Sequence, residues 1–206
     1  MKPTTQDFLE IEQIRDGIII LKNKGLRMIL MVSSLNFALK SEEEQNAIIY
    51  QFQEFLNSLD FPCQIVVQSR KINITGYLEK LKEFEVKEKN ELIKIQIKEY
   101  SEFINKLVET GSIMQKNFYV VVPFFLNEIV FNKDKKSVIT SLTEDVFQRA
   151  KTQIIQRAEF VALGLRGCGL QAVPLNNLEI TELFWSLYHQ MEAEQGFYPN
   201  FPQDIS

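Results

Sequence analysis

The chain has 206 residues, of which 45% are hydrophobic, so it is long enough to bury a core without help from a metal or a disulfide. Its net charge of −4 and pI of 5.3 give no basic field for a nucleic-acid backbone, so direct nucleic-acid binding is not expected. Its apolar runs are much shorter than the roughly 20 residues that cross a bilayer, so no membrane span is expected.

The first predicted element is a β-hairpin near the N-terminus. Two apolar runs, Ile18 to Leu21 and Leu26 to Val32, flank a turn in which Gly25 is expected at a positive φ angle. The second run is apolar at nearly every position. It therefore predicts a central strand that is covered on both faces.

Three elements are predicted between residues 41 and 108. Ser41-Glu42-Glu43-Glu44 fits the capping-box pattern and predicts a helix that ends at Asp60-Phe61-Pro62. Cys63 to Gln68 predicts a short strand. Ile74 to Val108 predicts one long charged helix, whose Glu and Lys residues at four-residue spacing, such as Glu83 and Lys87, indicate a solvated face. A partner-binding face is the alternative.

The second half of the chain predicts a strand from Phe118 to Phe124, in which Pro123 requires an edge or terminal position. Residues 127–137 predict an exposed loop. Ser141-Leu142-Thr143-Glu144 repeats the capping-box pattern and predicts a helix that ends near Gly164 or Gly167. A strand over 170–175, a helix over 178–191 and a tail over 196–206 follow.

This order of elements predicts an α+β fold, in which amphipathic helices pack on one mixed, mainly antiparallel sheet. We expect one domain over residues 1–196 and a tail or linker over 197–206. The sequence shows no internal repeat and no low-complexity block.

No pattern in the sequence supports catalysis, a metal site or a bound cofactor. The chain has no P-loop, and the glycine-rich segment Gly164 to Gly169 follows a helix, so it predicts helix termination. His189 is the only histidine, and its position on the last helix favours packing or exposure over catalysis. Cys63 and Cys168 have no metal-ligand spacing and no secretory leader precedes them, so both are expected to be reduced thiols in the cytoplasm.

One set of basic residues could contact phosphate if the fold brought them together: Arg70, Lys71, Arg149, Lys151, Arg157 and Arg166. Two alternatives to a protein-interaction domain therefore stay open. One is a nucleic-acid-binding accessory protein, which salt-dependent DNA binding would reveal. The other is a small enzyme on an α+β scaffold, which a deep polar pocket would favour.

Several stretches together resemble the N-terminal, non-motor domain of the TraC-like ATPases of conjugation and type IV secretion systems. Each stretch is weak alone, but in combination they cover nearly the whole chain: Glu12 to Gly17, Leu30 to Ser41, Asn57 to Arg70, Tyr119 to Phe124, and Leu170 through Tyr188.

The resemblance implies a non-catalytic assembly or docking domain of a bacterial conjugative DNA-transfer ATPase. In that family the domain precedes a RecA-like motor with Walker motifs, which this sequence lacks. The implied partners are the motor ATPase and inner-membrane secretion components, with a homo-oligomer as a further option. The implied location is the cytoplasm or, peripherally, the cytoplasmic face of the inner membrane. The resemblance assigns no interface residue.

Overall fold

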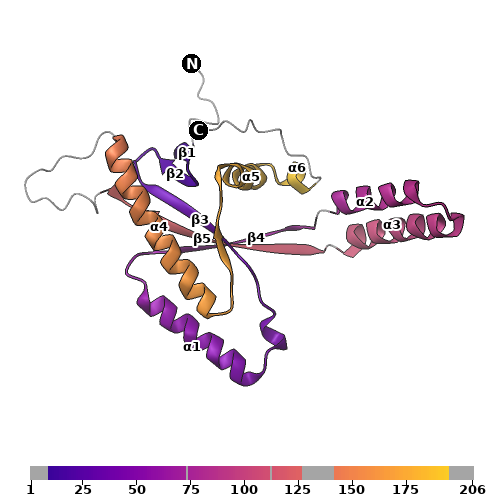
Figure 1. The fold of residues 1–206 in the computed structure, drawn as a ribbon, viewed down its shortest axis with the longest axis horizontal. Helices are drawn as coiled ribbons and strands as arrows, with labels where there is room; N and C mark the ends of the chain where they lie inside the picture. The colour runs from indigo at the N-terminus through magenta and orange to yellow at the C-terminus, as the bar shows by residue number, and fades with distance from the viewer. Residues whose placement is uncertain (1–8, 73, 112, 127–141, 195–206) are drawn as a thin grey trace, which may run out of the picture. The chain divides into compact units, whose positions relative to one another are not determined.

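The computed structural model describes residues 9–72, 74–111, 113–126 and 142–194 (Figure 1). The strands are β1 (Ile11–Arg15), β2 (Ile18–Leu21), β3 (Leu26–Val32), β4 (Gln64–Lys71), β5 (Met114–Phe124) and β6 (Ala172–Pro174). The helices are η2, a 3-10 turn (Phe37–Leu39), and α1 (Glu42–Ser58), α2 (Thr75–Lys87), α3 (Glu91–Gly111), α4 (Glu144–Gly167), α5 (Asn177–Tyr188) and α6 (Gln190–Glu194). The predicted α+β fold is confirmed.

The strands form one six-stranded sheet in the order β1-β2-β3-β5-β4, and β6 pairs with β3. The strand β3 is central, as predicted. It runs antiparallel to β5 from Leu26 opposite Phe124 to Val32 opposite Phe118, and its other side pairs with β2 and then with β6. The prediction that β3 is covered on both faces is correct for most of the strand. It is wrong near the end of the strand, where the side chain of Met31 is 45% exposed.

The core lies on one face of this sheet, under α4. Alternation along β3 directs Leu26, Met28 and Leu30 to that face, where all three are buried. The facing side of α4 contributes a stripe of buried residues at helical spacing: Phe147, Ala150, Ile154, Ala158, Val161 and Leu165. This stripe agrees with the amphipathic helix predicted for the segment.

The N-terminal hairpin is extended by β1, which the sequence did not predict. A register irregularity between Ile11 and Gln13 breaks the two-residue alternation that would have indicated a strand.

The turn between β2 and β3 also differs from the prediction, because the positive φ of 63° falls on Lys24 and not on Gly25. The Asn23 side chain accepts the Gly25 amide at 2.9 Å, which closes the turn around Lys24.

The capping box at α1 is confirmed. Ser41 Oγ accepts the Glu44 amide at 3.3 Å, and the Glu44 carboxylate accepts the Ser41 amide at 3.0 Å. The capping box predicted at the start of α4 is wrong. The N-cap there is Thr143, which makes no side-chain cap bond, and Glu144 is the first helical residue and not the third, as a capping box requires. Its carboxylate binds Arg15 instead.

The single long helix predicted over 74–108 is also wrong, because the segment forms the antiparallel hairpin of α2 and α3. The Glu88 side chain accepts the amides of Lys89 and Asn90, and the Asn90 side chain accepts the Leu92 amide at 3.0 Å. These bonds end one helix and start the next. The Lys87–Glu83 ion pair is present at 3.6 Å.

The described residues divide into two compact units. The first combines the described parts of 1–67 and 117–181, and the second combines those of 68–116 and 182–200. The loop predicted over 127–137, the tail over 196–206 and the domain boundary at 196 lie outside the described residues or at their limit. The one-domain expectation over 1–196 stays a prediction.

Candidate protein-interaction site

An open apolar cleft of about 320 Å³ lies in the first unit, beyond the end of the core. Within the described part of the chain, no acidic or basic side chain lines it. The lining comes from β3 and the segment after it, η2, α1, β4, β5 and the end of α4: Val32, Ser33, Ser34, Leu35, Phe37, Ile48, Phe52, Ile65, Phe118, Tyr119, Val120, Leu165 and Leu170.

The end of α4 forms one wall of the cleft. The helix stops in a Schellman arrangement, in which Gly169 has a φ of 80° and the Leu170 amide donates to the Leu165 carbonyl at 3.0 Å. This turn brings the two leucine side chains together on the cleft wall. Ser33 and Gln171 then fix the neighbouring segment through two hydrogen bonds, of 2.8 and 2.9 Å.

The helix α1 forms another wall of the cleft, and it packs closely against α4 at Gly164. Phe55 is the one buried residue of α1, and its ring lies against Gly164. A Cβ at Gly164 would come within 2.2 Å of that ring, so glycine sets how closely the helices approach. The neighbouring ring of Phe52, with its centroid 6.0 Å from that of Phe55, faces the cleft. Of the two predicted helix ends, Gly167 is the one observed, and Gly164 lies inside α4.

The rim of the cleft exposes large apolar side chains. Phe37 on η2 and Ile65 on β4 line the cleft and are 39% and 59% exposed. Val67 follows on the same face of β4 and is also exposed. Such clustering of apolar surface marks sites that another molecule covers. The cleft can therefore take apolar side chains, and its described lining contains no carboxylate, imidazole, amine or guanidinium group.

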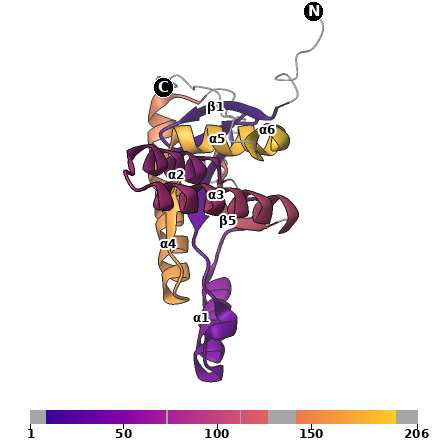
Figure 2. The ribbon, with the colours of Figure 1, turned by 90° about the vertical axis from the view of Figure 1, so that its right-hand side faces the viewer.

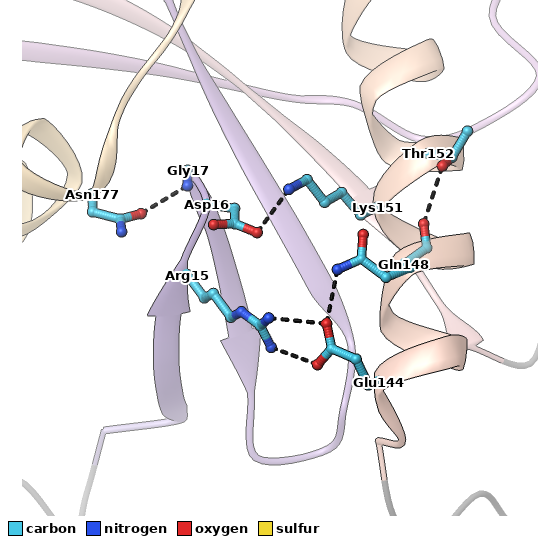
Figure 3. A network of polar contacts seen from close by, with 8 residues as sticks. All are labelled: Arg15, Asp16, Gly17, Glu144, Gln148, Lys151, Thr152 and Asn177. Atoms are coloured by element: carbon cyan, nitrogen blue, oxygen red, sulfur yellow. Dashed lines mark hydrogen bonds and ion pairs between the residues drawn. The ribbon is translucent and has the colours of Figure 1, made fainter. Parts of the chain in front are cut away.

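The segment Arg15-Asp16-Gly17, part of the family-like stretch, has a structural role (Figure 3). Arg15 donates two hydrogen bonds of 2.9 Å to the Glu144 carboxylate, which lowers the pKa of that carboxyl group. Asp16 pairs with Lys151 on α4 at 2.7 Å, and the Gly17 amide donates to the Asn177 side chain at 2.7 Å. These contacts tie the β1–β2 turn to α4 and to the start of α5.

The cysteines and the histidine considered for chemistry each have an ordinary structural environment. Cys168 is buried, Cys63 is half-buried, and burial raises the pKa of both thiols, so neither is an activated thiolate. His189 is exposed and stacks on Trp185 with ring centroids 4.9 Å apart. The glycine-rich segment ends α4, as predicted. Among the described residues, no group of acidic, histidine and cysteine side chains could hold a metal ion.

The basic residues of α4 do not form one patch. Positions 149, 151, 157 and 166 point in different directions around a helix of 3.6 residues per turn. Lys151 is paired with Asp16. Arg157 stacks on the rings of Phe61 and Phe124 and donates to the Pro123 carbonyl at 3.0 Å. These two side chains are therefore engaged in holding the fold.

The second unit contains a small polar cavity of about 50 Å³, lined in part by Gln68, Arg70 and Ser186. The buried Gln68 Oε1 has no hydrogen-bond partner among the described residues. The cavity is not the deep polar pocket that would favour an enzyme. None of the helices in the described part of the chain combines the length and hydropathy that crossing a bilayer requires.

The fold and the cleft define an α+β domain with an apolar surface site. A family model described as the archaeal TraC-like domain matches residues 12–186, so the chain belongs to the TraC-like family. No curated protein and no solved structure gave a match. The TraC-like resemblance is thereby confirmed. The match does not extend to a bacterial conjugation setting, because the family is described as archaeal.

Proposed function

We propose that this domain is a non-catalytic assembly module of a TraC-like DNA-transfer ATPase, and that it docks onto the motor protein through the apolar cleft. The setting that we propose is a conjugative or type IV secretion apparatus, with the domain at the cytoplasmic face of the inner membrane. The resemblance supports this setting, because in the related ATPases the equivalent domain accompanies a separate RecA-like motor region.

The observation that carries the proposal is the chemistry of the cleft. Its described lining is apolar apart from Ser33, Ser34 and the Tyr119 hydroxyl, and its rim exposes Phe37 and Ile65. Burying one large apolar side chain fully stabilises a complex by about 1.5–3 kcal/mol, and a few such anchors dominate most interfaces. The cleft therefore suits a protein anchor better than a polar substrate.

The test is a titration of the purified chain against a candidate Walker-motif motor ATPase from the same organism, followed by calorimetry and by ATPase rate. Ile65→Glu places a charge at the cleft rim, and because the native side chain is largely exposed, the fold should tolerate it. We expect binding to weaken at least about tenfold. The matched control is Val86→Glu on α2, an exposed apolar residue outside the cleft.

Equal binding by both variants would contradict docking through the cleft. Failure of the wild-type chain to bind any motor or inner-membrane component would reject the assembly role itself. Deleting residues 178–206 is a poorer test, because it removes Ile180, which is fully buried, and would disturb the fold. DNA binding that falls steeply with salt would favour the accessory-protein alternative instead.

A further inference from the structure

The strand β4 forms one edge of the sheet. Among the strands that the structure describes, β4 pairs with β5 alone, and β1 ends the order on the other side. In both views α1, which lines the cleft together with β4, lies at the opposite end of the first unit from β1 (Figures 1 and 2). An edge strand leaves every second amide and carbonyl group of its backbone without a partner in the sheet, so it can accept a further strand.

The backbone groups of Ile65 and Val67 lie on the open side of β4. The Ile72 amide, one residue beyond the end of β4, donates to the Ile113 carbonyl beside the start of β5 at 3.0 Å. Since successive amides along a strand point to opposite sides, the amides of the even-numbered residues of β4 face β5. Those of Ile65 and Val67 therefore face away from it. Both side chains lie on the cleft face of the strand and are 59% and 53% exposed.

The other edge strands, β1 and β6, carry features that block further pairing. The strand β1 has a register irregularity between Ile11 and Gln13 and a charged residue, Glu12, within it. The strand β6 is only three residues long and ends at Pro174. Irregularities, charges, prolines and short lengths are the usual protection of edge strands. The segment from Gln64 to Val67 has no charged residue and no proline, so this edge is open to a partner strand.

The charge near the end of β4 restricts the chemistry of that partner. Lys71 is the last residue of β4 and, by the alternation of side chains, shares the cleft face with Ile65 and Val67. Lys116 on β5 lies on the same face, because Phe118, two residues further, lines the cleft. Both lysines are exposed, and neither forms an ion pair with any residue that the structure describes. Apolar side chains and a carboxylate at alternate positions of a paired strand complement this order.

We propose that β4 accepts an extended segment of a partner protein as an additional antiparallel strand, with apolar side chains of that segment in the cleft and a carboxylate beside Lys71. Main-chain hydrogen bonds to Ile65 and Val67 supply affinity, and the side chains supply specificity. Antiparallel pairing is the more stable kind, and it places the acidic residue before the apolar ones in the segment. The inference deepens the proposed function and rests on it for the cleft as a docking site. It adds that the docked segment is a strand.

Hydrogen exchange of single amides in the full chain, followed by NMR, tests the open edge. In the free protein the amides of Ile65 and Val67 should exchange at least about tenfold faster than those of Val66 and Gln68, which face β5. The probe is a short synthetic peptide that has a glutamate, a serine and then leucines at alternate positions, with threonine between them. At saturation it should slow the exchange of Ile65 and Val67 at least about tenfold.

Variants of the chain and of the peptide separate backbone pairing from side-chain contact. Val67→Pro removes an amide on the open side, a position at which a sheet tolerates proline, and it should weaken peptide binding at least about tenfold. The matched control Val67→Thr keeps the amide and the strand propensity, so it should bind within about threefold of the wild type. Methylation of the leucine amides of the peptide, which face β4, should abolish binding, whereas methylation of the threonine amides should not. Lysine in place of the glutamate should weaken binding several-fold.

Four results would overturn strand addition from a partner. The first is slow exchange of Ile65 and Val67 in the free monomer, and the second is no peptide binding at millimolar concentration. The third is equal binding by Val67→Pro and Val67→Thr, or binding without protection of the two amides. The fourth is protection that appears without peptide as the protein concentration rises, because a second copy would then occupy the edge.

The same variants separate this inference from motor docking. Motor binding that Val67→Pro leaves unchanged would reject strand addition and retain docking through the cleft. Peptide binding that protects Ile65 and Val67, together with no binding of the motor, would reject the motor as the partner and retain strand addition.

Discussion

Replacing Gly164 with alanine tests how α1 is held to α4. Alanine in a helix interior normally stabilises by about 1 kcal/mol relative to glycine. Here the new Cβ would lie 2.2 Å from the ring of Phe55, so the ring and α1 must move. Overpacking of this kind costs about 1–3 kcal/mol and outweighs the helix gain, so we expect a net destabilisation of up to about 2 kcal/mol. Urea unfolding measures the change.

Two further variants complete the test. Phe55→Ala removes the obstructing ring, and in that background Gly164→Ala should stabilise by about 1 kcal/mol, which reverses its sign. Gly167→Ala in the same helix is the control, because a Cβ there meets no atom within 4 Å. It should be neutral or stabilising. A stabilising Gly164→Ala in the otherwise unchanged chain would refute the close contact.

Three other predictions concern the contacts that hold the β1–β2 turn and the reactivity of the thiols. Since Arg15 lowers the pKa of Glu144 below its ordinary 4.5, the stabilisation is present above that pH and is lost as the pH falls through the folded-state value. The stability difference between wild type and Glu144→Gln should therefore shrink in acid. Gly17→Ala should cost more than about 1 kcal/mol, because φ is 73° and a Cβ would lie 2.9 Å from a carbonyl oxygen. Iodoacetamide should label Cys63 before the buried Cys168, as followed by mass spectrometry.

Each of these predictions has a clear contrary result. A stability difference that is constant between neutral and acid pH would show that the Glu144 ion pair does not form. A neutral Gly17→Ala would mean that the turn relaxes, and Gly76→Ala, where nothing lies within 4 Å, provides its control. Equal labelling of both cysteines in the folded chain would contradict the burial of Cys168.

Sequence patterns within a few residues, such as apolar runs and capping residues, correctly predicted several strands and helix starts. The apolar runs of β2 and β3 and the capping box at Ser41 appear in the structure where they were expected. The start of α5 carries a similar signal, from which no helix start was predicted. Asn176 and Glu179 each accept the other's backbone amide through the side chain, in the same pattern as Ser41 and Glu44.

Distant contacts explain what the sequence did not predict. The capping box at 141–144 fails because α4 begins at Glu144, and the Glu144 carboxylate binds Arg15, which is far away in sequence. Gly164 resembled a helix end, but its role depends on Phe55 in another helix. The break between α2 and α3 could have been inferred from Asn90, a preferred N-cap residue, and from the unusual length of the predicted helix.

The cleft could not be predicted from the sequence, because its lining comes from segments between Val32 and Leu170 that only the fold brings together. The resemblance indicated the family, which the match over 12–186 confirms, but it assigned no interface residue. Residues in its first stretch, Arg15 to Gly17, hold the turn to α4 and α5.

The most direct test of the central claim is the affinity of the wild-type chain, Ile65→Glu and Val86→Glu for the motor ATPase. Docking through the cleft predicts that wild type and Val86→Glu bind alike and that Ile65→Glu binds at least about tenfold more weakly. Equal affinity of all three, or no binding by a folded wild-type chain, would contradict it.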